Sequence, residues 1–230
     1  PSDPATTRTG YSLAGWSDDD DSSAEYAADL SDYTMGSAND TIYAVWTANN
    51  NTVTFDNNSG SGTMSDQIIV SGTATTLTAN TMTRTGFTFD GWNTQADGNG
   101  TDYADEESVT LTGDLDLFAQ WIGNDNTVTF DNNSGSGTMT DQTIVSGTAT
   151  TLTDNTVTRT GYTFDGWNTA ADGSGDDYAD EESVTLIADL DLFAQWTANN
   201  NTVSFSSGSG SGTMADQTIV TDVATNLRLN

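Results

Sequence analysis

Apolar and polar residues alternate in short runs along this chain, and clusters of Gly, Asn, Ser and Asp separate the runs. Alternation with a period of two is typical of β-strands, because successive side chains of a strand point to opposite faces. Residues 73–80 break this pattern and fit either an extended segment or a short helical turn. The pattern predicts a mainly β fold, with strands at residues 52–56, 68–70, 86–92, 109–111 and 115–121.

The same pattern returns every 75 residues. Residues 51–125 and 126–200 agree at 62 of 75 positions, and each contains two tryptophans. Self-similarity at a fixed period indicates a repeat architecture in which each copy is one structural unit. We therefore expect a linear array of repeats, with complete copies at residues 51–125 and 126–200.

Two partial repeats flank the complete copies. Residues 201–230 restart the repeat, and residues 1–50 hold its later part. When the repeats are aligned with one another, Asn230 and Pro4 occupy the same position (the same column of the alignment). The two partial repeats are therefore complementary with almost no overlap. Half of a unit of about 75 residues is too small to bury a self-sufficient core. We therefore expect residues 1–50 to act as an acceptor for residues 201–230, which act as a donor.

Charge and apolar content support this junction. Residues 201–230 carry two acidic residues and one arginine, a net charge of −1, whereas residues 1–50 carry nine acidic residues and one arginine, a net charge of −8. Electrostatic repulsion between residues 201–230 and residues 1–50 is therefore limited when they dock. The donor side chains fall in columns where we expect core residues, and the acceptor contributes tryptophans. The predicted subunit junction consists of Trp16, Trp46, Val203, Phe205, Met214, Ile219 and Val220.

Three arrangements could pair the two partial repeats. Identical subunits could join head to tail, and such heterologous contacts give rings or open filaments. The chain could instead be a segment of a longer tandem-repeat surface protein, or the two parts could close on each other within one chain. Residues 201–230 match residues 126–155 at only 19 of 30 positions. This divergence fits a junction selected for its own pairing, although terminal copies of repeat arrays also drift.

The charge of the chain narrows the classes of partner. It has 34 acidic residues, four arginines and no lysine, a net charge of −30. Such a charge excludes nucleic acid and anionic membrane surfaces as electrostatic partners. Salt screens the self-repulsion, so the composition indicates a saline habitat, and a calcium-rich one fits almost as well. The longest apolar runs are far below the ~20 residues of a membrane span, so membrane insertion is not expected.

Candidate catalytic and metal-binding chemistry is sparse. Without Cys or His the chain lacks thiolate and imidazole groups, and we expect no catalytic residues, no cofactor and no metal ion. Residues 97–102 resemble the start of a calcium loop, but the twelfth position, which needs Glu, is Ser108. A solvated turn is the favoured interpretation. Every feature recurs in each copy, which argues against one unique active site.

Aromatic and basic residues have two interpretations each. Tyr103, Tyr178 and the tryptophans could form a sugar-binding platform, but their place in alternating strands favours core packing. One arginine recurs in each copy among many acidic residues, at Arg8, Arg84 and Arg159. A structural ion pair with a carboxylate is the favoured role for these arginines.

The runs Gly161-Tyr162-Thr163-Phe164, Gly166-Trp167 and Ala171-Asp172-Gly173-Ser174-Gly175, followed by Leu192-Phe193-Ala194-Gln195-Trp196, resemble the Listeria–Bacteroides repeat, the B-repeat of internalin-type surface proteins. This resemblance covers nearly the whole chain. It implies small β-grasp-like modules strung in tandem on secreted or cell-surface proteins as a spacer or adhesive stalk. It implies no enzymatic activity.

Together these features predict a secreted, non-enzymatic structural subunit. We expect it to polymerise head to tail into an extracellular filament or pilus-like fibre of a salt-adapted microbe, with identical subunits as partners. The alternative is a stalk or spacer segment of a cell-surface adhesin that binds a protein or glycan through the outer faces of its modules.

Overall fold

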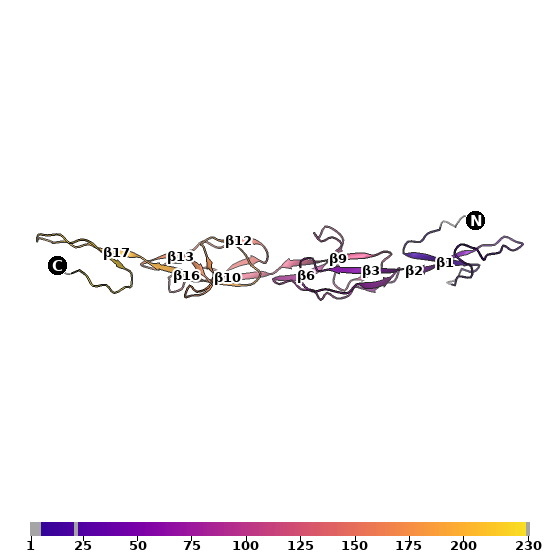
Figure 1. The fold of residues 1–230 in the computed structure, drawn as a ribbon, viewed down its shortest axis with the longest axis horizontal. Coiled ribbons are helices and arrows are strands. Elements are labelled where there is room, and N and C mark those ends of the chain that lie inside the picture. Colours follow the sequence, from indigo (N-terminus) through magenta and orange to yellow (C-terminus); the bar gives the residue numbers. More distant parts are fainter. Residues whose placement is uncertain (1–5, 21–22, 229–230) are drawn as a thin grey trace. The chain divides into compact units, whose positions relative to one another are not determined.

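The computed structural model describes residues 6–20 and 23–228, so Pro4 and Asn230 lie outside the described part. The chain forms two compact units, Pro1–Ile122 and Gly123–Asn230 (Figure 1). The described residues form strands, bridges, turns and bends and no helix, which confirms the predicted β class. The helical turn considered for residues 73–80 is not formed, and part of that segment is a short strand instead.

The complete repeat of the first unit is a five-stranded mixed sheet in the order β4-β3-β9-β6-β7. Its central pair, β3 and β9, is parallel from Val53 opposite Leu115 to Asp56 opposite Phe118. The first and last strands of the repeat therefore lie side by side at its centre. A second, two-stranded sheet joins β5 to β8. The strands are β3 (Asn50–Asp56), β4 (Gln67–Val70), β5 (Thr75–Thr76), β6 (Phe87–Asn93), β7 (Asp102–Tyr103), β8 (Ser108–Val109) and β9 (Leu115–Gly123).

The complete repeat of the second unit has the same topology, with the order β11-β10-β16-β13-β14 and a small β12-β15 sheet. The parallel pair again joins the first and last strands, from Val128 opposite Leu190 to Asp131 opposite Phe193. The strands are β10 (Asp125–Asp131), β11 (Gln142–Val145), β12 (Ala149–Thr151), β13 (Tyr162–Asn168), β14 (Asp177–Tyr178), β15 (Ser183–Thr185) and β16 (Leu190–Ala198).

Each complete repeat has its own hydrophobic core on one face of the sheet. Val53 and Leu117 are each 0% exposed and belong to one buried cluster with Trp92 and Leu77, which are each 1% exposed. Burying an aliphatic or aromatic side chain of this kind contributes about 1.5–3 kcal/mol each. The alternation along β3 and β9 supplies these residues, because every second side chain points inward.

Strand β13 contains a bulge that strict alternation does not predict. Its register with β16 shifts between Phe164 and Gly166, where the glycine has a φ of +132°. A Cβ at Gly166 would lie 2.8 Å from the carbonyl oxygen of Tyr178. The bulge turns Phe164 and Trp167, three residues apart, toward the same face, and their rings pack at 5.0 Å. Without it the two rings would lie on opposite faces.

The partial repeats each contribute a two-stranded antiparallel sheet. In the first unit, β1 (Tyr11–Ser17) pairs with β2 (Tyr43–Ala48). In the second unit, β17 (Asn200–Val203) pairs with β18 (Gln217–Val220). In the order of the complete sheet, β18 and β17 correspond to the first two strands, and β2 and β1 to the next two.

Candidate functional site: the joints and the open half-repeats

A single residue, Asn49, connects the N-terminal partial repeat to the complete repeat that follows it. Its backbone N–H donates to the Gly10 carbonyl at 2.9 Å, and its own carbonyl accepts from the Ser71 N–H at 2.8 Å. Its side-chain Oδ1 accepts from the Ser12 hydroxyl at 2.6 Å. The residue is therefore held by both neighbours, which restricts bending at this joint.

The joint between β16 and β17 in the second unit repeats this geometry. Asn199 donates its backbone N–H to the Gly161 carbonyl at 2.8 Å and accepts from the Thr221 N–H at 2.9 Å. Tyr162 adds a contact across the joint, because its hydroxyl donates to the Asp222 carboxylate at 2.8 Å. This hydrogen bond, together with burial, raises the pKa of Tyr162 above its usual value.

The strands of the partial repeats are shorter than their counterparts where a partner strand is missing. In the complete repeat, residues 53–56 of β3 pair with residues 115–118 of β9. The corresponding strand β17 ends at Val203, at the start of that ladder. Likewise β2 begins at Tyr43, whereas β9 begins at the position matching residue 40. Residues 204–206 and 40–42 thus lie outside strands, whereas their counterparts 54–56 and 115–117 lie in β3 and β9.

Apolar side chains of the C-terminal partial repeat are less buried than their counterparts. Val203 and Ile219 are half-buried, whereas the matching Val53 and Ile69 are 0% and 1% exposed. Leu227 is 52% exposed, while the matching Leu77 is 1% exposed. The sequence analysis did not select Leu227, although its column, shared with buried leucines, could have identified it.

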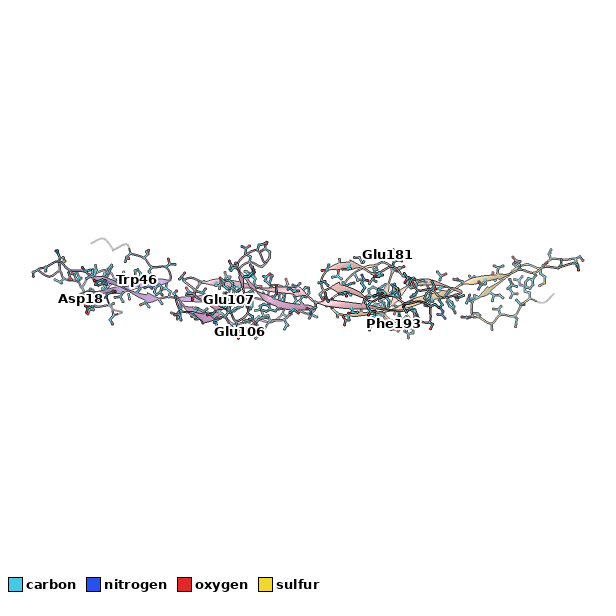
Figure 2. All side chains as sticks on the ribbon, turned by 180° about the vertical axis from the view of Figure 1, so that it is seen from behind. Asp18, Trp46, Glu106, Glu107, Glu181 and Phe193 are labelled. Carbon is cyan, nitrogen blue, oxygen red and sulfur yellow. The ribbon has the colours of Figure 1, made fainter. Side chains whose placement is uncertain are left out.

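In the N-terminal partial repeat, Trp16 is half-buried, whereas the matching Trp92 and Trp167 are each 1% exposed. Trp46 lies on β2, opposite Leu13, and is labelled in Figure 2. The predicted acceptor residues are therefore in the first unit and the predicted donor residues are in the second. Their pairing across a subunit contact stays a prediction.

One predicted junction residue does not match a core position. Val220 is 37% exposed, and its counterparts Val70 and Val145 in the complete repeats are 44% and 42% exposed. These valines lie on the outward face of the edge strand, so the expected core role of Val220 is wrong. Phe205 and Met214 correspond to Phe55 and Met64, which pack against the core of the first complete repeat.

The turns that resemble calcium loops are organised by a buried amide. Asn93 is 0% exposed; its Nδ2 donates to Asp102 Oδ1 at 2.6 Å, and its Oδ1 accepts from Gly100 N at 2.9 Å. Asp97 accepts hydrogen bonds from Asn99, which lower its pKa. Within the described ranges, acidic side chains form no group of three or more placed to hold a metal ion.

The recurring arginines contact aromatic rings. The guanidinium carbons of Arg8, Arg84 and Arg159 lie 3.8–3.9 Å from the ring centroids of Tyr11, Phe87 and Tyr162. The expected partner was a carboxylate, but the contact that the structure shows is cation–π stacking. Each pair is three residues apart across the tight turn that precedes a strand, and the stacking stabilises that turn.

A shallow hollow recurs in both complete repeats, beside Gly91 of β6 and Gly166 of β13. In the first repeat it encloses about 320 Å³ and is lined by Trp92, Tyr103, Asp90 and Gln120. In the second it encloses about 480 Å³ and is lined by the matching residues. Aromatic, amide and carboxylate groups are thus grouped on the surface of each complete repeat.

In the described part of the chain, no helix is long and apolar enough to cross a membrane.

Comparison with known proteins places these β modules in a family. The Listeria-Bacteroides repeat domain matches residues 52–120 and 127–195, the two complete repeats. This chain belongs to the Listeria-Bacteroides repeat family. The divergent InlB B-repeat domain matches residues 4–50, the N-terminal partial repeat. The resemblance drawn from the sequence is thereby confirmed, and the family is one of cell-surface proteins.

Two relatives of this repeat chain come from Evansella cellulosilytica. One, named "Putative Gly-rich membrane protein", is 33% identical over 213 residues, covering 89% of this chain and 24% of the relative. The other, named "Putative membrane protein", is 31% identical over 199 residues, covering 84% of this chain and 29% of the relative. The chain therefore spans about a quarter of the length of these relatives. No solved structure matches it.

Proposed function

We propose that this chain is a non-enzymatic structural part of an extracellular cell-surface assembly, in which β modules are joined in series and partial repeats complete each other. One observation carries the proposal: the two-stranded sheets of the two partial repeats together supply four of the five strands of a complete sheet. Strands β18-β17 and β2-β1 correspond, in order, to the strands β4-β3-β9-β6 of a complete sheet.

In the form we infer for this chain, residues 201–230 of one subunit complete residues 1–50 of the next, and the product is a head-to-tail filament. The half-buried Val203 and Ile219 and the exposed Leu227 would gain the burial of their counterparts. Burying several such side chains, with new strand hydrogen bonds, supplies a stable association. The acidic, lysine-free surface suits assembly in a saline medium, where salt screens repulsion.

The second candidate function is a stalk or spacer of a cell-surface adhesin. Two observations favour it. The matched region is only 24% and 29% of the two relatives, and the hollow beside Trp92 and Tyr103 in the first complete repeat has a counterpart in the second. In this form the completing half follows within the same polypeptide, and the hollows bind a glycan or a protein loop.

Denaturing electrophoresis of the surface fraction of the source cells separates the two forms. The chain has no cysteine or lysine for disulfide or lysine isopeptide bonds, so a denatured filament should release subunits of 24.2 kDa. A stalk gives one polypeptide several times longer. Finding only the long polypeptide with an antibody to residues 51–200 would contradict the filament form and support the stalk.

A further inference from the structure

The loop of the C-terminal partial repeat surrounds a cavity of about 260 Å³. In the complete repeats, the corresponding loop lies against a tryptophan of the last strand, Trp121 on β9 or Trp196 on β16. The C-terminal partial repeat contains the loop but none of the strand that carries this tryptophan. The cavity is lined by Phe205, Ser206, Ser207, Gly210, Ser211, Gly212, Thr213 and Met214.

Two contacts define how the tryptophan fits this loop in a complete repeat. The indole Nε1 of Trp121 donates to the Asn57 carbonyl at 2.9 Å. A Cβ built on Gly60 would lie 2.7 Å from Cζ2 of the same ring, so the ring lies directly against the glycine. Trp196 repeats both contacts, at 3.0 Å from the Asn132 carbonyl and 2.8 Å from a Cβ on Gly135.

The residues that make these contacts have counterparts in the open loop. Ser207 falls in the column of Asn57 and Asn132, and Gly210 in the column of Gly60 and Gly135. In the open loop, a Cβ on Gly210 would meet only the Ser207 carbonyl, at 3.1 Å. The indole that covers the other two glycines is therefore the feature that this loop lacks within the described residues.

We propose that Trp46 from a second copy of this chain inserts into the cavity. Its Nε1–H donates to the Ser207 carbonyl, and its ring lies against Gly210. Trp46 is in the column of Trp121 and Trp196, and it faces Leu13 as Trp196 faces Phe164. This inference rests on the proposed completion of partial repeats and specifies how the two parts meet.

The seated tryptophan fixes the register of a new parallel ladder. In the complete repeats, residues 53–56 pair with 115–118 and residues 128–131 with 190–193. The same columns place Val203 opposite Asp40 and Phe205 opposite Ile42. Residues 204–206 and 40–42 lie outside strands in the structure, so both are free to form this ladder. The result is a sheet in the order β18-β17-β2-β1, with a parallel pair at its centre.

Sedimentation velocity of the full chain in 1 M NaCl tests the insertion of Trp46 into the cavity. The parent chain should self-associate, and Trp46→Ala should weaken association by roughly 30-fold or more, as expected for a central aromatic anchor. Gly210→Val places a side chain where the Trp46 ring would lie, and this side chain meets few atoms in the open loop. The substitution should therefore block association without unfolding the chain. Ala215→Val, at an exposed position outside the cavity, is the matched control and should associate normally.

Disulfide trapping tests the register, since the chain has no native cysteine. Thr41→Cys and Ser204→Cys occupy the columns of Asp116 and Thr54, whose side chains are hydrogen-bonded at 2.6 Å. A mixture of these two variants should form a disulfide dimer under mild oxidation. Tyr43→Cys, two residues out of register on the same face, should not trap Ser204→Cys.

The outcomes separate the inference from the function on which it rests. Association that survives Gly210→Val, or that is trapped equally well through residue 43, overturns the Trp46 seat while leaving completion of the partial repeats intact. A parent chain that stays monomeric at all concentrations overturns both. Loss of association in Gly210→Val and not in Ala215→Val, with trapping only through residue 41, supports both.

Discussion

The indole nitrogen of Trp121 donates a hydrogen bond to the backbone carbonyl of Asn57, 64 residues earlier in the chain and 2.9 Å away. The bond joins the last strand of a repeat to the loop that follows its first strand. Trp196 and Asn132 repeat it at 3.0 Å in the second complete repeat. In both complete repeats the final strand therefore also holds the loop that follows the first strand.

Truncation of the two equivalent tryptophans Trp92 and Trp16 should have unequal effects. Trp92 is 1% exposed in a complete core, so Trp92→Ala should destabilise that repeat by about 3–5 kcal/mol. Trp16 is half-buried, so Trp16→Ala should cost much less in the isolated chain. Urea unfolding followed by hydrogen exchange of each segment would measure both. Equal costs would show that the N-terminal partial repeat already has a closed core.

Removal of the Asn93 amide should unfold the turn that follows β6. The buried amide bonds both to Asp102 and to the Gly100 N–H, so Asn93→Ala leaves both without that partner and should cost about 1–3 kcal/mol. The matched control is Asn99→Ala, because Asn99 is exposed on the same turn. Its effect should stay within about 0.5 kcal/mol. A similar loss of stability in both variants would contradict the organising role of the buried amide.

The Tyr162–Asp222 contact predicts a pH dependence at the second joint. The pKa of Tyr162 is raised above the usual 10.0, first by its hydrogen bond to the Asp222 carboxylate and then by burial. The folded state thus favours the neutral phenol, so its contribution is fully present below pH 10 and is lost as pH rises through the higher folded pKa. Titration of the tyrosine ring signals by NMR measures this shift.

Asp222→Asn is the matched control for that titration, because it keeps the size of the side chain and removes the carboxylate. Its Tyr162 should titrate closer to pH 10.0, the usual value. An unchanged Tyr162 titration in this variant would contradict the assigned cause.

Salt should stabilise the chain. A net charge of −30 on 230 residues produces strong self-repulsion. The screening length falls from about 30 Å at 0.01 M ionic strength to about 3 Å at 1 M, so the melting temperature should rise over this range. Calorimetry in NaCl would measure the rise, with an uncharged osmolyte of equal osmolality as the control. A melting temperature that is independent of NaCl would show that the acidic groups are too far apart to destabilise the fold.

Much of the fold could be predicted from the sequence, because the period of two and the period of 75 residues are both direct consequences of structure. Alternation identified β3 and β9, whose inward side chains Val53 and Leu117 are 0% exposed. Alternation did not reveal that these two strands are neighbours, since pairing between residues 62 positions apart leaves no local pattern. The helical turn failed for a related reason: residues 75–76 are held extended by the distant strand β8.

The candidate junction was predictable only in part. Alignment of the repeats selected Val203 and Phe205 as candidates, but it did not select Leu227 and Gly210, whose proposed roles are inferred from contacts of their counterparts in the complete repeats. The prediction of Val220 as a core residue was wrong. Its counterparts lie on β4 and β11, which are edge strands with one solvent-facing side, and composition alone does not show this. The arginines were assigned to carboxylates by abundance, whereas turn geometry places an aromatic ring three residues away within reach.

The parallel pairing of β3 with β9 also determines how a complete repeat carries tension. The chain enters the module at the start of β3 and leaves it at the end of β9. Pulling on these two points slides the neighbouring strands along each other, so the ladder between residues 53–56 and 115–118 is loaded in shear. Its hydrogen bonds must break together instead of one after another. A repeat built in this way resists extension until it yields in a single step.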